Sequence, residues 1–236
     1  MSADRIPQPF EAVDPEELLG PLNEVEKKNA PRHLFVAGDR SLLHAGPRVS
    51  IVGSRKASPE GLAAASRLSE SVVTRGAVVV SGLAEGIDTA AHESALDFRG
   101  RTIAVLGTPL DEFFPAKNRA LQERIMREHL AVSQFAAGVP SRPGNFPMRN
   151  RTMALLSDAT VIVEAGEQSG SLHQGWEALR LGRPLFLLES LIRDPVLSWA
   201  REMEGYGAQA LVLENLELLF ELLPERARGQ ASQLAF

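Results

Sequence analysis

Short aliphatic runs recur along most of this chain, and segments with a helical spacing of apolar positions separate them. We predict strands over residues 34–37, 49–52, 77–80, 102–106, 130–133, 159–163, 184–188 and 210–213. We predict helices over about 15–22, 58–75, 88–98, 118–128, 148–156, 171–181, 195–204 and 216–222. Near-continuous aliphatic strands that alternate with helices predict an α/β fold, in which helices cover both faces of a mostly parallel sheet.

Four strand-to-helix loops in this pattern are rich in glycine or serine: residues 53–57, 81–88, 140–146 and 166–171. Right-handed crossover connections place such loops at the carboxyl ends of the strands, so we expect the four to share one rim. Each loop precedes a helix N-terminus, where free backbone N–H groups and the helix dipole favour an anion. The pattern therefore predicts a phosphate-binding rim, with Asp88 capping the helix after the second loop.

Positive charge gathers in one of these loops and in the helix that follows it. Residues 129–157 contain no Asp or Glu, although the whole chain has a net charge of −5. Arg142, Arg149 and Arg151 lie in this interval together with Phe146. Cations beside an aromatic ring suggest a seat for phosphates and a base. The alternative is a solvated segment whose arginines pair with acids elsewhere in the fold.

Composition narrows the function classes. A chain of 236 residues can build one sizeable domain, and the absence of cysteine excludes disulfides and thiolate zinc sites. No apolar run approaches the roughly 20 residues of a membrane helix, so we expect a cytoplasmic protein without a membrane partner. The five histidines are scattered, and neither a dinucleotide fingerprint nor a Walker loop occurs. We therefore expect no metal, no cofactor and no catalytic residues.

The chain divides into three expected parts. Residues 1–29 carry many prolines and charges, which predicts a loosely packed N-terminal arm. Residues 30–223 hold the regular pattern of strands and helices and form the predicted domain. Residues 224–236 are expected to be a frayed C-terminal tail.

The rim loops, taken together, resemble the DNA-processing protein A family, known as DprA or Smf. The resemblance extends from about Ala30 to Phe186. It rests on Val49-Ser50-Ile51-Val52-Gly53-Ser54-Arg55, on Ser81-Gly82-Leu83-Ala84-Glu85-Gly86-Ile87-Asp88, on Thr102-Ile103-Ala104-Val105-Leu106-Gly107, on Asn145-Phe146-Pro147 with Arg149-Asn150-Arg151, and on Val163-Glu164-Ala165 with Ser169-Gly170-Ser171-Leu172.

This resemblance implies an extended Rossmann-like, doubly wound fold, a homodimer, single-stranded DNA across the rim loops, and a RecA-type recombinase as partner. The chain would be a minimal member without an appended winged-helix domain. The resemblance and the residue pattern together give one set of expected DNA- and phosphate-binding residues: Gly53, Ser54, Arg55, Ser81, Gly82, Arg142, Phe146, Arg149, Asn150, Arg151, Ser169, Gly170 and Ser171.

Two acids near the rim, Glu85 and Glu189, leave a second hypothesis open. If both face the arginines, the site would suit a small nucleotide better than a long strand, as in a non-catalytic sensor related to the cytokinin-activating LOG enzymes. A nucleotide N-glycosidase is less favoured, because the helix after Gly170 continues Leu172-His173-Gln174 where such hydrolases carry a glutamate. A third hypothesis is a scaffold that acts through partner surfaces alone.

Overall fold

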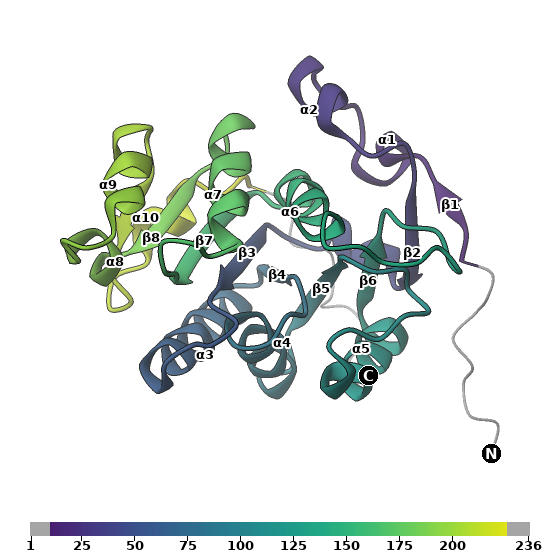
Figure 1. The fold of residues 1–236 in the computed structure, drawn as a ribbon, viewed down its shortest axis with the longest axis horizontal. Coiled ribbons are helices and arrows are strands. Elements are labelled where there is room, and N and C mark those ends of the chain that lie inside the picture. Colours follow the sequence, from purple (N-terminus) through teal and green to yellow (C-terminus); the bar gives the residue numbers. More distant parts are fainter. Residues whose placement is uncertain (1–9, 226–236) are drawn as a thin grey trace, which may run out of the picture.

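A computed structural model of the chain describes residues 10–225. Its described part is built on one sheet of nine strands in the order β1-β2-β6-β5-β4-β3-β7-β8-β9 (Figure 1). The strands are β1 (Ala12–Val13), β2 (Leu34–Gly38), β3 (Arg48–Gly53), β4 (Val78–Ser81), β5 (Arg101–Leu106), β6 (Leu130–Ser133), β7 (Ala159–Glu164), β8 (Leu185–Leu188) and β9 (Gln209–Leu211).

The helices lie between these strands along the chain. They are α1 (Pro15–Leu19), α2 (Glu24–Asn29), η1 (Arg40–Leu43), α3 (Pro59–Thr74), α4 (Ile87–Asp97), η2 (Ala116–Asn118), α5 (Arg119–Glu128), α6 (Asn145–Leu156), α7 (Ser171–Arg180), α8 (Glu189–Arg193), α9 (Ser198–Gly205) and α10 (Glu217–Glu221).

The chain reverses its direction of travel across the sheet at β3. From β3 it moves outward through β4, β5 and β6, and it then returns to the other side of β3 to form β7, β8 and β9. These strands pair in parallel, whereas β2 is antiparallel to both β1 and β6. The loops after β3 and β7 lead to helices on opposite faces of the sheet (Figure 1). In open α/β sheets such a switch point favours a ligand site outside the carboxyl ends of these strands.

Both faces of the sheet are buried because successive side chains of each strand point to opposite sides. In β3, Val52 belongs to the core cluster under α6, α7 and α9, whereas Val49 and Ile51 belong to the cluster under α3, α4 and α10. Val78 and Val79 of β4 divide in the same way. The prediction of a mostly parallel sheet with helices on both faces is therefore confirmed, and near-continuous aliphatic strands are its cause.

A buried ion pair fixes the amino ends of β3 and β7 beside each other. Arg48 donates from Nε and Nη2 to the two carboxylate oxygens of Asp158, at 3.2 and 3.1 Å, and its backbone N–H donates at 2.8 Å. Both side chains are almost completely buried. This bidentate pairing holds the two strands that flank the crevice in one register.

Several element ends differ from the prediction. Helix α6 begins at Asn145 rather than 148, because Pro147 is accommodated in its first turn, where a missing N–H has no cost. Helix α4 begins at Ile87, and its N-cap is Gly86 at φ 75° with no side-chain cap. The expectation that Asp88 is the cap was wrong, since Asp88 lies inside the first turn. Helix α8 was not predicted.

Residues 1–29 were expected to form a loosely packed arm, but the described part of this segment, residues 10–29, is packed against the rest of the chain. Val13 and Leu18 are buried, β1 pairs with β2, and Glu26 of α2 forms a largely buried ion pair with Arg183 at 2.8 Å. Residues 10–29 therefore pack against the sheet and against Arg183, which lies just before β8. Residues 1–9 and most of the expected tail at 224–236 lie outside the described residues.

Within residues 10–225, no helix combines the length and apolarity that a membrane crossing requires.

Candidate phosphate-binding site

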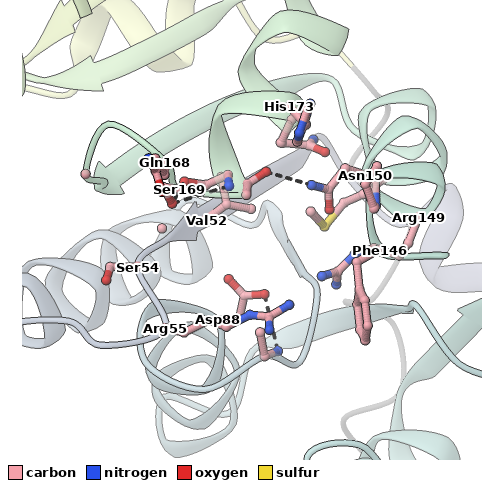
Figure 2. A pocket seen from close by; sticks show the side chains of 18 of the residues that line it. Val52, Ser54, Arg55, Asp88, Phe146, Arg149, Asn150, Gln168, Ser169 and His173 are labelled. Atoms are coloured by element: carbon pink, nitrogen blue, oxygen red, sulfur yellow. Dashed lines mark hydrogen bonds between the residues drawn. The ribbon is translucent and has the colours of Figure 1, made fainter. Parts of the chain in front are cut away.

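A cavity of about 580 Å³ opens at the carboxyl ends of β3 and β7 (Figure 2). The four loops that were expected to share one rim, or the helices that follow them, all contribute to it. Its lining consists of Val52, Gly53, Ser54, Arg55, Lys56, Ala84, Asp88, Phe146, Pro147, Arg149, Asn150, Met153, Gly166, Gln168, Ser169, Gly170, Ser171, His173 and Gln174. This is the crevice that the switch in strand order creates.

Two of the four helix N-termini at the rim already hold a carboxylate of the protein itself. At α3, Glu164 from the end of β7 accepts from the backbone N–H of Ser58 at 3.1 Å and from its hydroxyl at 2.5 Å. A Cβ on Gly61 would lie 2.2 Å from a Glu164 oxygen, so glycine makes room for this carboxylate. At α4, the first turn contains Asp88. The N-terminus of α3 is therefore occupied, and at α4 the first N–H group, that of Ile87, donates to the carbonyl oxygen of Ser54 at 3.2 Å.

The N-termini of α6 and α7 have no such carboxylate. Their N-cap residues are Gly144 and Gly170, neither helix has a side-chain cap, and neither has an acid in its first turn. The amide of Asn150 donates to the carbonyl oxygen of Gly170 at 3.0 Å and so joins the two helices. The first backbone N–H groups of both helices already donate to oxygens of the preceding turn, and Pro147 has no N–H, so α6 and α7 favour an anion beside the cavity chiefly through their dipoles.

Arg149 is a buried cation in the wall of the cavity. Its side chain crosses from α6 to β5, where Nη1 donates to the carbonyl oxygen of Val105 at 2.9 Å. Gly82 lies directly against the guanidinium, since a Cβ there would be 1.5 Å from Nη1. Nε is buried without a hydrogen-bond partner among the described residues. A desolvated guanidinium with an unused donor is costly unless an anion completes it.

Asp88 is the one carboxylate among the described residues that line this cavity. It is 5% exposed, and it accepts a hydrogen bond from the backbone N–H of Ala84 at 3.3 Å. Burial raises the pKa of Asp88, and the charge of Arg149 opposes that rise. Burial lowers the pKa of Arg149. The charge of Asp88 opposes this decrease, and the charge of Arg55 adds to it. The two charges therefore compensate each other inside the fold.

Phe146 lies beside one cation, Arg55, and a second aromatic ring, Phe114. The guanidinium carbon of Arg55 lies 5.1 Å from the centroid of the Phe146 ring, and the ring of Phe114 lies 5.5 Å away. A Cβ on Gly107 would be 2.6 Å from the ring, so the backbone of Gly107, directly after β5, packs against the ring. A base that stacks here would have to cover or displace the Arg55 guanidinium, which is itself a suitable stacking partner.

Nine expected residues come together around the cavity, and four do not line it. The nine are Gly53, Ser54, Arg55, Phe146, Arg149, Asn150, Ser169, Gly170 and Ser171. The other four have different surroundings. Ser81 is buried and donates to the carbonyl oxygen of Ile51, Gly82 lies against Arg149, Arg142 is exposed outside the cavity, and Arg151 pairs with Glu177 at 3.0 Å.

The two acids that left the ligand class open do not face Arg149 or Arg151 in ion pairs. Glu85 pairs with Lys117 at 2.9 Å, and Glu189 pairs with Arg193 at 2.7 Å. Neither belongs to the cavity lining. Sequence reasoning did not select Lys56, Gln168 or His173, which do line it; Lys56 directly follows the selected Arg55, whereas the other two carried no distinguishing signal.

Comparison with known proteins shows the family of this chain. A family model for DNA recombination-mediator protein A matches residues 15–223. The chain belongs to this family. The prediction from the rim motifs is thus confirmed.

Relatives within the family are similar over most of this chain. It is 38% identical over 193 residues to the DNA processing protein DprA of Streptococcus pneumoniae, covering 82% of this chain and 67% of the relative. It is 34% identical over 196 residues to the Bacillus subtilis DprA, covering 83% of this chain and 65% of that protein. The chain thus spans about two thirds of the length of these relatives.

A solved structure of DNA processing protein A from Helicobacter pylori, described for its single-stranded DNA binding mode, superposes with a TM-score of 0.76. The two chains are 28% identical, and the match covers 92% of this chain and 98% of the other. The extended Rossmann-like fold expected from the sequence is thereby confirmed.

Proposed function

We propose that the protein binds single-stranded DNA in the cavity at the carboxyl ends of β3 and β7 and passes it to a RecA-type recombinase. The observation that carries this proposal is the charge of the cavity. Arg55, Lys56 and Arg149 line it with Asp88 as the single opposing acid among the described lining residues, although the chain as a whole is acidic. A local cationic cleft in an acidic protein is typical of a site that selects a polyanion.

The N-termini of α6 and α7, which have no acid in their first turns, place the positive ends of two helix dipoles beside the cleft. The hydroxyls of Ser169 and Ser171 are hydrogen-bonded to each other at 2.7 Å, so the pair has one O–H left to donate to a phosphate oxygen. Phe146 with Arg55 offers a surface on which a base can stack without regard to sequence. The Helicobacter pylori relative, whose structure is described for its single-stranded DNA binding mode, supports this ligand class.

Fluorescence anisotropy with a labelled, unstructured oligonucleotide tests the proposal. Arg55→Glu places an acid in the cleft and should weaken binding at least about tenfold, which corresponds to about 1.4 kcal/mol. Arg124→Glu is the matched control, because Arg124 is an exposed arginine of α5 that pairs with Glu128 away from the cavity. Equal affinities of the Arg55 and Arg124 variants would refute the assignment of the site.

A small nucleotide is the second candidate ligand. The cavity volume of about 580 Å³ lies within the range of small-molecule sites, roughly 300–1,000 Å³. A thermal-shift panel separates the two. The DNA proposal predicts that oligonucleotides raise the melting temperature more than nucleoside monophosphates do at equal phosphate concentration, and the sensor hypothesis predicts the reverse.

We also infer that binding is not followed by a chemical step, that the protein acts as a homodimer, and that it works in the cytoplasm. The carboxylate of Asp88 is directed to the Ala84 amide, which favours a structural over a catalytic role. Release of free base from nucleoside monophosphates would contradict the absence of a chemical step.

Light scattering of the purified protein tests whether it is a homodimer. A pull-down of a RecA-type recombinase tests the transfer of DNA to that partner.

A further inference from the structure

Asp88 is an unexpected residue in a site for phosphates. Its side chain is nearly buried and still lines the cavity that the phosphates would enter (Figure 2). A second anion brought close to this carboxylate repels it in an environment that water screens poorly. The protein must either hold the phosphate away from Asp88 or neutralise Asp88 when the strand arrives.

The surroundings of Asp88 favour neutralisation. Arg149 of α6 is its main countercharge, and Arg55 and Lys56 come from the loop after β3. Behind Asp88, His92 on the same helix is fully buried and bonded to Thr102, and burial lowers its pKa to about 3, so it carries no charge near neutral pH.

Arg149 is the cation that connects Asp88 with an incoming phosphate. It forms no direct ion pair with a described residue, and its Nε has no partner among them. A phosphate that bonds to this guanidinium takes over the countercharge that now compensates Asp88. The carboxylate is then left buried with less compensation, and protonation removes the unfavourable charge.

We propose that Asp88 takes up a proton when single-stranded DNA binds, so that the charge state of this residue regulates the affinity of the cleft. This inference rests on the proposed function. The direction of the pH effect follows from the thermodynamic linkage between proton uptake and DNA binding. A carboxyl group whose pKa is higher in the complex than in the free protein makes binding tighter as the pH falls through the interval between the two values. Burial already raises the pKa of Asp88 in the free protein, so the interval lies above the ordinary range of aspartate.

Binding to an oligonucleotide measured from pH 5 to 8 at constant ionic strength tests the inference. The wild type should bind up to about tenfold more tightly for each unit of pH decrease within the interval, the limit for one proton. Asp88→Asn keeps an acceptor for the Ala84 amide; it should bind at least as tightly as the wild type at pH 8 and lose the pH dependence. Calorimetry of the wild type in two buffers of different ionisation enthalpy should detect proton uptake, without any variant that could misfold.

Two control variants separate Asp88 from its neighbours. His173 of α7 also lines the cavity and carries a titratable ring, so His173→Gln should retain the pH dependence. Glu85→Gln removes an equal charge from a half-buried residue near Asp88 that pairs with Lys117, and this variant should also retain the pH dependence. A pH-independent wild type, dependence that persists in Asp88→Asn, or dependence that disappears in His173→Gln would overturn the inference. Absence of binding at every pH would instead refute the proposed function.

Discussion

Gly82→Ala should test whether the packing of Arg149 organises the cleft. The added Cβ would lie 1.5 Å from Nη1, 2.3 Å from Cζ and 2.7 Å from Nη2 of Arg149, all far inside van der Waals contact. The guanidinium can move only if it gives up its bond to Val105, and a charged hydrogen bond contributes about 1.5–3 kcal/mol. If the loop moves instead, overpacking costs about 1–3 kcal/mol. Both routes predict a loss of folding stability of similar size.

For a chain of this length each kcal/mol corresponds to about 2–4 °C, so the melting temperature of Gly82→Ala should fall by roughly 2–12 °C. A displaced Arg149 should also weaken oligonucleotide binding by about tenfold or more. Gly166→Ala is the matched control for stability, because nothing lies within 4 Å of its added Cβ in the same cavity wall. A Gly82 variant as stable and as tight-binding as the wild type would refute the reasoning.

Three further predictions concern other residues. Phe146→Ala should weaken oligonucleotide binding by about 1–3 kcal/mol in anisotropy titrations, and unchanged affinity would exclude stacking on this ring. Asp158→Ala should lower the free energy of unfolding by about 3–5 kcal/mol in urea, because it leaves Arg48 buried and unpaired; a loss under about 1 kcal/mol would contradict this. His92 has a folded pKa of about 3, below its unfolded value, so its contribution to stability is present above the unfolded pKa and is lost as the pH falls. Between pH 6.5 and 5 the unfolding free energy should therefore fall by up to about 1.4 kcal/mol per pH unit, and His92→Gln should flatten this slope.

The fold was accessible from the sequence because its determinants are local. Aliphatic runs such as residues 49–52 and 159–163 are buried on both faces, and that burial requires the uninterrupted hydrophobic pattern from which they were predicted. The convergence of the rim loops followed from the handedness of the crossovers. Helix ends were less accessible, since Gly86 rather than Asp88 became the N-cap through a positive φ that no side-chain pattern announces.

The details of the site depended on contacts between distant parts of the chain. Glu164 occupies the N-terminus of α3 from 106 residues away, and Arg149 bonds to Val105 across 44 residues. Neither pairing leaves a spacing that sequence inspection can detect. In the sequence Arg151 looked equivalent to Arg149. In the fold it pairs with Glu177, another distant residue, and does not line the cavity.

The location of the bound strand tests the central claim most directly. An oligonucleotide with photoreactive 5-bromodeoxyuridine at each position in turn can be cross-linked to the protein and the modified peptides identified by mass spectrometry. The account predicts cross-links within residues 53–56, 146–150 and 168–174, which line the cavity. Cross-links confined to the amino ends of β3, β4 and β5, around Arg75 and Arg99, would contradict this claim.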